Sequence, residues 1–282
     1  MSTKVTIMDV KKAKEEGRKL VMCTAYDYPF GLLADEAGVD IVLVGDSLGM
    51  VVMGLDGTVE VTMEHMIHHI KAVMRGCKGP LVVGDMPFMS YNTSIRDAII
   101  NAGRLLKEGG CDAVKLEGGV DFASTIEAII KAGIPVQGHI GLTPQTASAL
   151  GGFKMQGRDA QAAKRIFDDA RALEEAGVFS IILEAVPAPL GELLSESVGV
   201  PVIGIGAGPH VDGQVLVTHD MIGLFDKFVP KFVKQYAKIR ETILEAMNGY
   251  KNDVLEGAFP GPEHSFKMPE KALEELKKLI KG

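Results

Sequence analysis

Short apolar runs recur along the chain, and a helix-like segment separates most of them from the next. Each run is apolar over several consecutive positions, which is typical of parallel strands covered on both faces. In chain order the runs are Leu20–Asp27, Ile41–Ser47, Leu81–Met86, Ala113–Gly118, Pro135–Leu142, Ser180–Val186, Pro201–Gly208 and Gln214–Asp220. Eight strand–helix units predict an α/β fold of the (β/α)8 or TIM-barrel type, with a doubly wound open sheet as the alternative.

Polar residues mark where the intervening helices should begin. Thr62, Ser94, Asp121 and Asp159 each precede a helical pattern, and their side chains can accept a hydrogen bond from a free backbone N–H of the first turn. Glycines placed before the strands can adopt the left-handed conformation that ends a helix. These are Gly38, Gly79, Gly110, Gly133, Gly177 and Gly199.

The two ends of the chain carry further predicted elements. Thr6–Gly17 predicts an extra helix that closes the bottom of the barrel, and Lys227–Gly257 predicts one or two long helices. The tail 259–266 is rich in Pro and Gly, and we expect it to fold over another part of the protein. Because no stretch resembles an interdomain linker, we expect residues 1–282 to form a single barrel domain.

Composition narrows the function classes. The 282 residues suit one complete barrel. A net charge of −7 without a Lys/Arg cluster argues against nucleic-acid binding. Three cysteines without a CxxC pair indicate a reducing compartment. We expect a cytoplasmic protein, because neither a secretory signal nor an apolar stretch of about 20 residues is evident.

Ionisable groups lie at the carboxyl ends of the apolar runs, where a barrel places its chemistry. They are Asp27, Asp46 with Ser47, Asp85, Lys115 with Glu117, His139, Glu184, and His219 with Asp220. Asp46 and Asp85 each follow a Val-Gly pair on neighbouring runs, and Glu117 ends the next run. Buried charge is costly unless it is paired or bound to metal, and an all-oxygen set suits Mg²⁺. These three acids therefore predict a magnesium site, with helix capping as the alternative role of the aspartates.

Three further strand-end residues have predicted roles in chemistry. Lys115 points to the same side of its strand as Glu117, so it would hold an anionic substrate oxygen beside the metal. A buried salt bridge and a Schiff-base lysine are the alternatives. Glu184 ends an apolar strand and suits a general base, or else a helix cap. His139 would orient substrate or move a proton, unless it is a core histidine.

Two other patterns are weaker. His65, His68 and His69 have helical spacing that suits zinc, but no fourth ligand is apparent. The glycine-rich stretch 204–208 lacks the placement of a phosphate loop, which favours close packing instead.

Eight motifs resemble the ketopantoate hydroxymethyltransferase family, in order across nearly the whole chain. They are TAYDYPFG at 24–31, VGDSLGMVVMG at 44–54, GDMPFMSY at 84–91, VKLEGG at 114–119, GHIGLTPQ at 138–145, LEAVP at 183–187, GIGAGPHVDGQVLVTHDMIG at 204–223 and FPGPEHSF at 259–266. The stretch LDGTVE at 55–60 is less typical of the family. The resemblance implies hydroxymethyl transfer from 5,10-methylenetetrahydrofolate to 3-methyl-2-oxobutanoate, which gives 2-dehydropantoate for pantothenate biosynthesis.

The resemblance also implies roles for individual residues. Asp46 and Asp85 resemble direct Mg²⁺ ligands, and Glu117 resembles the third acid. Glu184 resembles the proton acceptor, whose removal of a substrate proton gives a Mg-stabilised enolate. We expect the 2-keto acid to be bound by Asp46, Ser47, Asp85, Lys115 and His139. The resemblance also implies a homodecamer in the cytoplasm that binds small molecules and does not associate with a membrane.

Three other functions remain open from the sequence. A Mg²⁺-dependent enzyme of the isocitrate lyase and phosphoenolpyruvate mutase type would cleave a C–C or P–C bond without folate. A class I aldolase would use Lys115 and would be trapped by borohydride. A non-catalytic barrel would be expected to have lost the acids, and all three are present.

Overall fold

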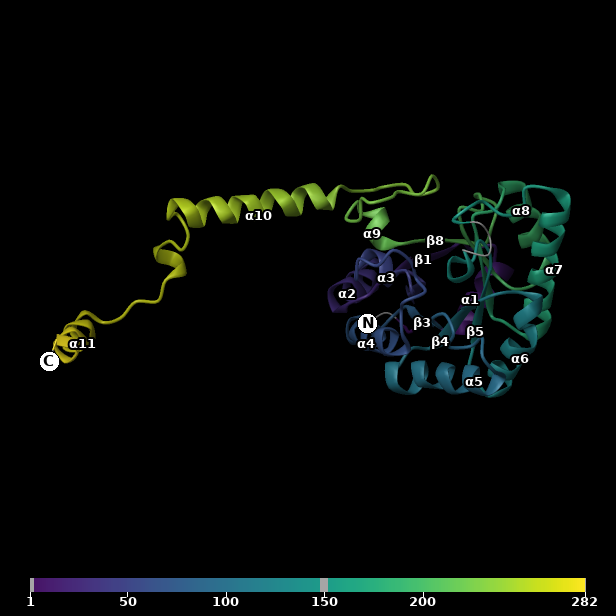
Figure 1. Ribbon diagram of the computed structural model, residues 1–282, viewed down its shortest axis with the longest axis horizontal. Coiled ribbons are helices and arrows are strands. Elements are labelled where there is room, and N and C mark those ends of the chain that lie inside the picture. The colour runs from purple at the N-terminus through teal and green to yellow at the C-terminus, as the bar shows by residue number, and fades with distance from the viewer. Residues whose placement is uncertain (1–2, 148–151, 282) are drawn as a thin grey trace.

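The computed structural model describes residues 3–147 and 152–281, and its sheet is a closed barrel of eight parallel strands in chain order (Figure 1). The strands are β1 Leu20–Thr24, β2 Ile41–Val44, β3 Leu81–Asp85, β4 Ala113–Glu117, β5 Val136–Gly141, β6 Ser180–Glu184, β7 Val202–Ile205 and β8 Gly213–Leu216. Every residue of β2, β3, β4 and β7 is buried, as expected for strands packed on both faces. The predicted barrel is confirmed, and the open sheet is excluded.

Helices separate successive strands, except that β8 follows β7 without a helix between them. They are α1 Ile7–Glu15, α2 Tyr28–Ala37, α3 Leu48–Val51, α4 Met63–Gly76, α5 Ile95–Arg104, α6 Ala123–Lys131, α7 Ala160–Ala176, α8 Ala188–Ser197, α9 Thr218–Met221, α10 Ile239–Glu256 and α11 Glu270–Lys281. Thr62, Ser94 and Asp159 cap α4, α5 and α7 as predicted. Asp121 does not cap α6, because it already lies inside a 3-10 turn, Val120–Phe122, that precedes the helix.

The glycine predictions are right where a helix ends in a left-handed residue. Gly38, Gly110 and Gly177 cap their helices in that conformation, and Gly133 has a φ of 88° directly after α6. The predictions for Gly79 and Gly199 are wrong. Both α4 and α8 pass directly into extended backbone, at Cys77 and Val198, so no left-handed residue is needed there.

The barrel bottom is closed by α1, as predicted. Val10 and Ala13 of this helix are buried in one cluster with Leu20, Ile41 and Leu81, the first residues of their strands. A capping box between Thr6 and Asp9 holds the start of the helix. The lower barrel is therefore a packed core, which leaves its upper end for chemistry.

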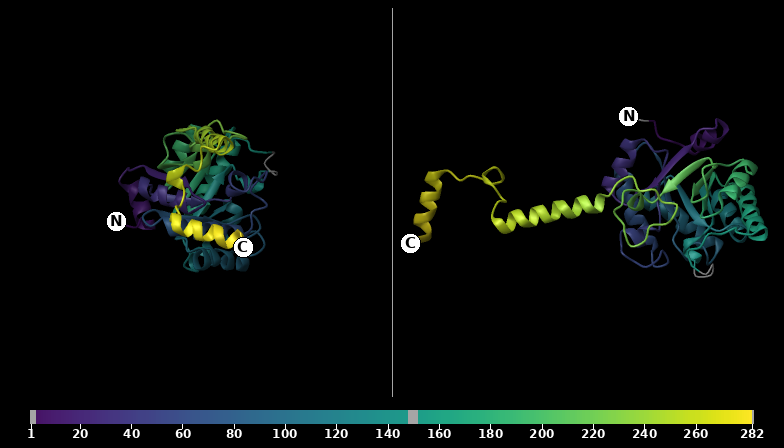
Figure 2. Two further views of the ribbon diagram at one scale, coloured as in Figure 1. Left: turned by 90° about the vertical axis from the view of Figure 1, so that its left-hand side faces the viewer. Right: turned by 90° about the horizontal axis from the view of Figure 1, so that it is seen from above.

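The C-terminal part leaves the barrel. Figures 1 and 2 show α10 and α11 extending away from it as an arm, and nearly all of their side chains are exposed. The predicted helix over Lys227–Gly257 is only partly right, because residues 227–238 are irregular. Pro230 lacks an amide proton and disfavours helical backbone at the residue before it. The tail 259–266 lies along the arm, where Phe259 packs against Tyr250 of α10 with 5.6 Å between ring centroids.

One sector of the barrel wall is uncovered in this chain. The chain continues from β8 into α9, a helix of only four residues, and then into the irregular segment. Val21 on β1 is 54% exposed, and Gln214 on β8 is exposed. No described helix packs over these outward-facing positions.

A search of the described helices for a segment both long and apolar enough to cross a bilayer finds none.

Candidate active site

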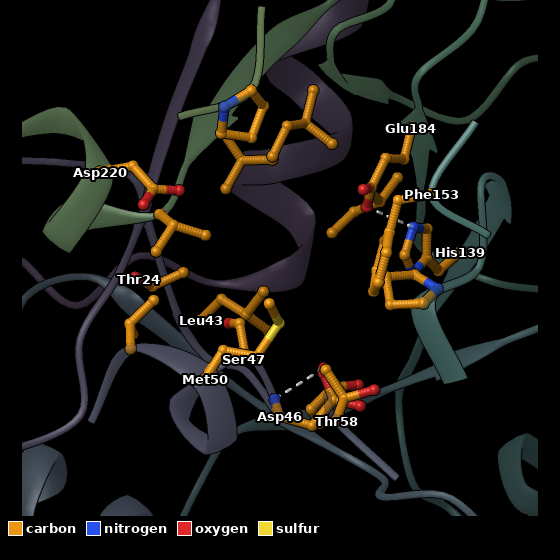
Figure 3. A pocket seen from close by; sticks show the side chains of 18 of the residues that line it. Thr24, Leu43, Asp46, Ser47, Met50, Thr58, His139, Phe153, Glu184 and Asp220 are labelled. Carbon is orange, nitrogen blue, oxygen red and sulfur yellow. Dashed lines mark hydrogen bonds and ion pairs between the residues drawn. The ribbon is translucent and has the colours of Figure 1, made fainter. Parts of the chain in front are cut away.

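A cavity of about 1020 Å³, including its open mouth, lies at the carboxyl ends of the strands. The parallel register brings the predicted residues to one level there. Asp85 pairs with Lys115 across β3 and β4, Glu117 pairs with His139 across β4 and β5, and Glu184 ends β6 beside Gly141. All of the predicted site residues line the cavity, and Figure 3 shows a close view of it.

Asp46 and Asp85 face each other at the floor of the cavity. Their residues are 4% and 1% exposed, and the backbone N–H of Asp46 donates to Asp85 Oδ2 at 3.2 Å. Neither side chain caps a helix, so the capping alternative is wrong for both. Asp46 reaches the floor from the turn after β2, while Asp85 is the last residue of β3. Two carboxylates from neighbouring strands are thereby buried side by side.

Charged groups continue from this pair around the cavity wall. Lys115 Nζ lies 2.8 Å from Asp85 Oδ1 and 3.2 Å from His139 Nδ1. His139 Nδ1 is 3.4 Å from Glu117 Oε1, and His139 Nε2 is 3.2 Å from Glu184 Oε2. Lys115, Glu117 and His139 are each 3% exposed, whereas the Glu184 side chain is 15% exposed. Of the acids at the cavity floor, Glu184 is therefore the most accessible.

Ser47 lies beside the acids on the β2 side. Its hydroxyl is 2.8 Å from the hydroxyl of Tyr26, and it lines the cavity. Met50, Val51 and Thr58 of the segment after β2 line the cavity as well. These three residues therefore form part of the cavity wall on the β2 side.

Gln145 and Tyr91 were missed by sequence reasoning. Gln145 donates from Nε2 to Asp46 Oδ2 at 2.8 Å, and its backbone N–H donates to Glu117 Oε2 at 3.0 Å. Tyr91 donates its hydroxyl proton to Gln145 Oε1 at 2.7 Å and accepts from the Glu117 N–H at 3.3 Å. Both residues are buried, so they orient the two acids from behind. Both lie in motifs already noted, but neither ends an apolar run.

The cavity floor carries more acids than bases. Burial, and then the carboxylates of Asp85 and Glu117, raise the pKa of Asp46 well above its ordinary value. Burial also raises the pKa of Asp85, although Lys115 opposes it. Burial and Lys115 lower the pKa of His139, but the neighbouring carboxylates outweigh them and raise it to about 9. The buried carboxylates therefore outnumber the positively charged groups that could neutralise them.

The donor set has the chemistry of a hard-cation site. Asp85 Oδ1 and Glu117 Oε1 are buried and accept no hydrogen bond from the described residues, although Lys115 and His139 lie near them. In the described part of the chain, no group of three or more His, Cys, Asp or Glu side chains is placed to hold a metal ion by itself. The two unpartnered carboxylate oxygens fit an ion such as Mg²⁺, which is commonly held by one or two carboxylates and completed by water and substrate oxygens.

Other strand-end residues have different positions. Asp27 caps α2 by accepting from the N–H of Phe30. His219 packs against the rings of Tyr26 and Phe30, at 5.3 and 5.1 Å between centroids, and burial lowers its pKa. His219 and Asp220 lie in α9 and not at the end of β8, because β8 stops at Leu216.

The histidines at helical spacing show no zinc geometry. His65 joins the capping box of α4 through Thr62, and His69 Nδ1 lies 2.6 Å from the backbone oxygen of Tyr26. These contacts use the rings of His65 and His69 in local structure.

The cavity has a second, largely apolar end. We call the apolar end the part lined by β8, the segment after it and Thr24 of the adjacent β1; its residues are Thr24, Val215, Val217, Asp220, Phe225, Phe228, Pro230 and Phe232. Figure 3 shows Asp220 and Thr24 across the cavity from His139 and Glu184. One cavity therefore joins a polar floor that suits a small acid to an apolar region that suits a second molecule.

Comparison with known proteins gives consistent similarities. A family model described as ketopantoate hydroxymethyltransferase matches residues 4–262. Proteins named 3-methyl-2-oxobutanoate hydroxymethyltransferase from Heliobacterium modesticaldum and Moorella thermoacetica are each 58% identical, over 95% and 94% of this chain and 97% and 98% of theirs.

Solved structures share the fold at low identity. Phosphonopyruvate hydrolase, in a complex with oxalate and Mg++, aligns with a TM-score of 0.60 at 12% identity and covers 98% of this chain and 96% of its own. A 2,3-dimethylmalate lyase of the PEP mutase/isocitrate lyase superfamily aligns with a TM-score of 0.59 at 13% identity, over 92% of both chains.

Proposed function

This chain belongs to the ketopantoate hydroxymethyltransferase family and is an enzyme, and we propose its reaction on that premise. It transfers a hydroxymethyl group from 5,10-methylenetetrahydrofolate to 3-methyl-2-oxobutanoate. The product is 2-dehydropantoate, for pantothenate biosynthesis. The observation that carries this proposal is the convergence of Asp46, Asp85, Lys115, Glu117 and Glu184 in one cavity at the carboxyl end of the barrel.

Magnesium fits the acidic floor of the cavity. Asp46 and Asp85 would hold the ion, with Glu117 as a third ligand, directly or through water. The excess of buried negative charge supports this, as does the structural neighbour solved with oxalate and Mg++. Bound there, Mg²⁺ would supply positive charge that opposes the negative charge developing on the keto acid during proton removal.

The side chains of this enzyme would then position the keto acid and remove its proton. Lys115 and Ser47 would bind its anionic end, and His139 would hold Glu184 through the 3.2 Å contact. Glu184 is the most accessible acid of the group and would take the proton from C3. The C3 carbon then bonds to the methylene carbon of the folate. The bonds from that carbon to the folate nitrogens are broken, and water supplies the hydroxyl oxygen.

An isocitrate lyase or phosphoenolpyruvate mutase reaction is the alternative. The solved neighbours of that superfamily are 10–16% identical to this chain, a level that shows the fold alone. The relatives at 54–58% identity carry the hydroxymethyltransferase name instead. Cleavage of a C–C or P–C bond without folate would favour the alternative.

A homo-oligomer is the expected state, by resemblance a decamer, in the cytoplasm. The arm supports assembly, because α10 exposes Leu244, Met247 and Leu255 at 50%, 64% and 77% with nothing of its own chain to cover them. The uncovered sector of the barrel contains a hollow of about 970 Å³ that Val21 and Phe232 line. We expect α10 of one protomer to cover this sector of another, in place of the missing long helix.

Truncation tests the assembly. Removing residues 239–282 should yield a smaller species by light scattering, whereas removing only 269–282 should leave α10 and the assembly in place. Equal masses for the two truncated proteins would contradict a role for α10.

Reconstitution tests the reaction. The protein is incubated with Mg²⁺, 3-methyl-2-oxobutanoate and 5,10-methylenetetrahydrofolate, and 2-dehydropantoate is measured with and without EDTA. We expect product that EDTA abolishes and added Mg²⁺ restores. No product under any of these conditions would refute the proposed reaction, and product that survives EDTA would refute the metal requirement.

A further inference from the structure

Asp220 is a buried acid that the proposed chemistry does not use. Its residue is 8% exposed, it lines the cavity, and its Oδ1 accepts no hydrogen bond from the described residues. Figure 3 shows its carboxylate turned toward the cavity, on the opposite side from Glu184. A buried carboxylate without a partner is costly, and such groups are concentrated at binding sites.

The surroundings of Asp220 suit a flat ring better than a second anion. Phe225, Phe228 and Phe232 line the cavity as well, and among the described residues Lys115, at the floor, is the only lysine or arginine that lines it. Burial alone raises the pKa of Asp220, to about 6, with no positively charged neighbour among the causes. The carboxylate is still ionised at neutral pH and would repel the anionic keto acid. It would attract a neutral ring that presents N–H donors.

A second metal site is a poor explanation of Asp220. Among the described residues, those that line the apolar end beside Asp220 include no second carboxylate, histidine or cysteine. The neighbouring His219 has its ring between two aromatic side chains, and its pKa is lowered by burial. An organic molecule with a donor edge and an apolar face fits the surroundings better.

We propose that Asp220 recognises the pterin ring of the folate co-substrate, by accepting hydrogen bonds from its N3–H and 2-amino groups. Those two donors are adjacent and parallel, so one carboxylate can accept from both. The aromatic side chains of the apolar end would cover the faces of the ring. This inference rests on the proposed use of methylenetetrahydrofolate and adds the residue that selects the ring.

Asp220→Asn and Asp220→Ala test the inference, with Asp226→Asn as the matched control. Asp226 is exposed and pairs with Arg240, so its replacement removes the same charge six positions away without changing the cavity. Binding of tetrahydrofolate is measured by calorimetry, and exchange of the C3 hydrogen of 3-methyl-2-oxobutanoate for deuterium is measured without folate. A tetrahydrofolate analogue with a methyl group in place of the 2-amino group probes the contact itself.

We expect both Asp220 variants to bind tetrahydrofolate about 10- to 100-fold more weakly, as for a lost hydrogen bond to a charged group. The control should bind as the unmodified enzyme does. The unmodified enzyme should discriminate against the methyl analogue, and Asp220→Ala should lose most of that discrimination. C3 exchange should stay within about twofold, because the keto acid lies at the other end of the cavity.

Two results would overturn the assignment. The first is unchanged tetrahydrofolate affinity and unchanged discrimination in the Asp220 variants. The second is a loss of C3 exchange as large as the loss of tetrahydrofolate binding. That result would show that Asp220 supports the folded structure or the keto-acid site instead. An unmodified enzyme that binds tetrahydrofolate but forms no 2-dehydropantoate would instead refute the proposed reaction, so the two failures are distinguishable.

Discussion

Replacing Asp220 with Asn should stabilise the protein at alkaline pH and much less at acid pH. Burial raises the pKa of this carboxyl from 3.8 to about 6, so the folded state binds its proton more tightly than the unfolded state does. Below pH 3.8 both states are protonated and the group costs nothing. Stability is then lost as the pH rises, and the full cost is present above pH 6.

The magnitude follows from the size of the shift. About two pKa units, at 1.36 kcal/mol per unit, correspond to about 3 kcal/mol at pH 8. At pH 4.5 the same linkage leaves about 1 kcal/mol. Asn has nearly the size of Asp and no charge, so the variant should recover most of that difference. For a chain of this length, 3 kcal/mol corresponds to a rise in Tm of about 5 °C.

Urea denaturation at pH 8 and pH 4.5 measures this effect. The two proteins are compared at one concentration, because an assembly stabilises its subunits by mass action. An advantage of equal size at both pH values would show that packing, and not ionisation, is responsible. No advantage at pH 8 would show that Asp220 has a partner in solution, and the reasoning would be wrong.

Three further substitutions probe the polar floor of the cavity. Glu184→Gln should lower C3 deuterium exchange by about 10²- to 10⁴-fold while binding of the keto acid survives, and retained exchange would remove Glu184 from the role of base. Gln145→Leu removes the donor to Asp46 Oδ2 and should weaken Mg²⁺ binding by about 10- to 100-fold, read from Mg²⁺ titrations of keto-acid binding; an unchanged midpoint would contradict this. Tyr91→Phe deletes the hydroxyl shared with Gln145 and should lower the free energy of unfolding by about 1–3 kcal/mol in urea, whereas a neutral result would mean that water replaces it.

Much of the fold could be predicted because it is encoded locally. Strands buried on both faces must be apolar at successive positions, so the eight runs were visible without tertiary information. Helix caps at Thr62, Ser94 and Asp159 were visible for the same reason, since a cap involves only the first turn. The errors at Asp121 and Gly79 also concern helix ends, where the adjoining turn decides the backbone conformation.

The polar floor was predictable to the extent that its residues end apolar runs. Asp46, Asp85, Lys115, Glu117, His139 and Glu184 were expected to meet, and all line one cavity. Gln145 could not be found in this way. It follows β5 on a 3-10 turn and reaches Asp46, which is 99 positions earlier in the chain. Only closure of the barrel brings such residues within hydrogen-bonding distance.

By itself, the sequence determined the eight strands, their order and the presence of charge at their carboxyl ends, because the cost of burying polar groups leaves a pattern in neighbouring residues. Tertiary structure alone decided which of those charges meet. Asp27 and Asp220 each end a predicted apolar run, yet Asp27 caps a helix and Asp220 faces the cavity. That difference depends on the path of the chain after each strand. Hydrophobic pattern does not record such a path, and the packing of distant segments sets it.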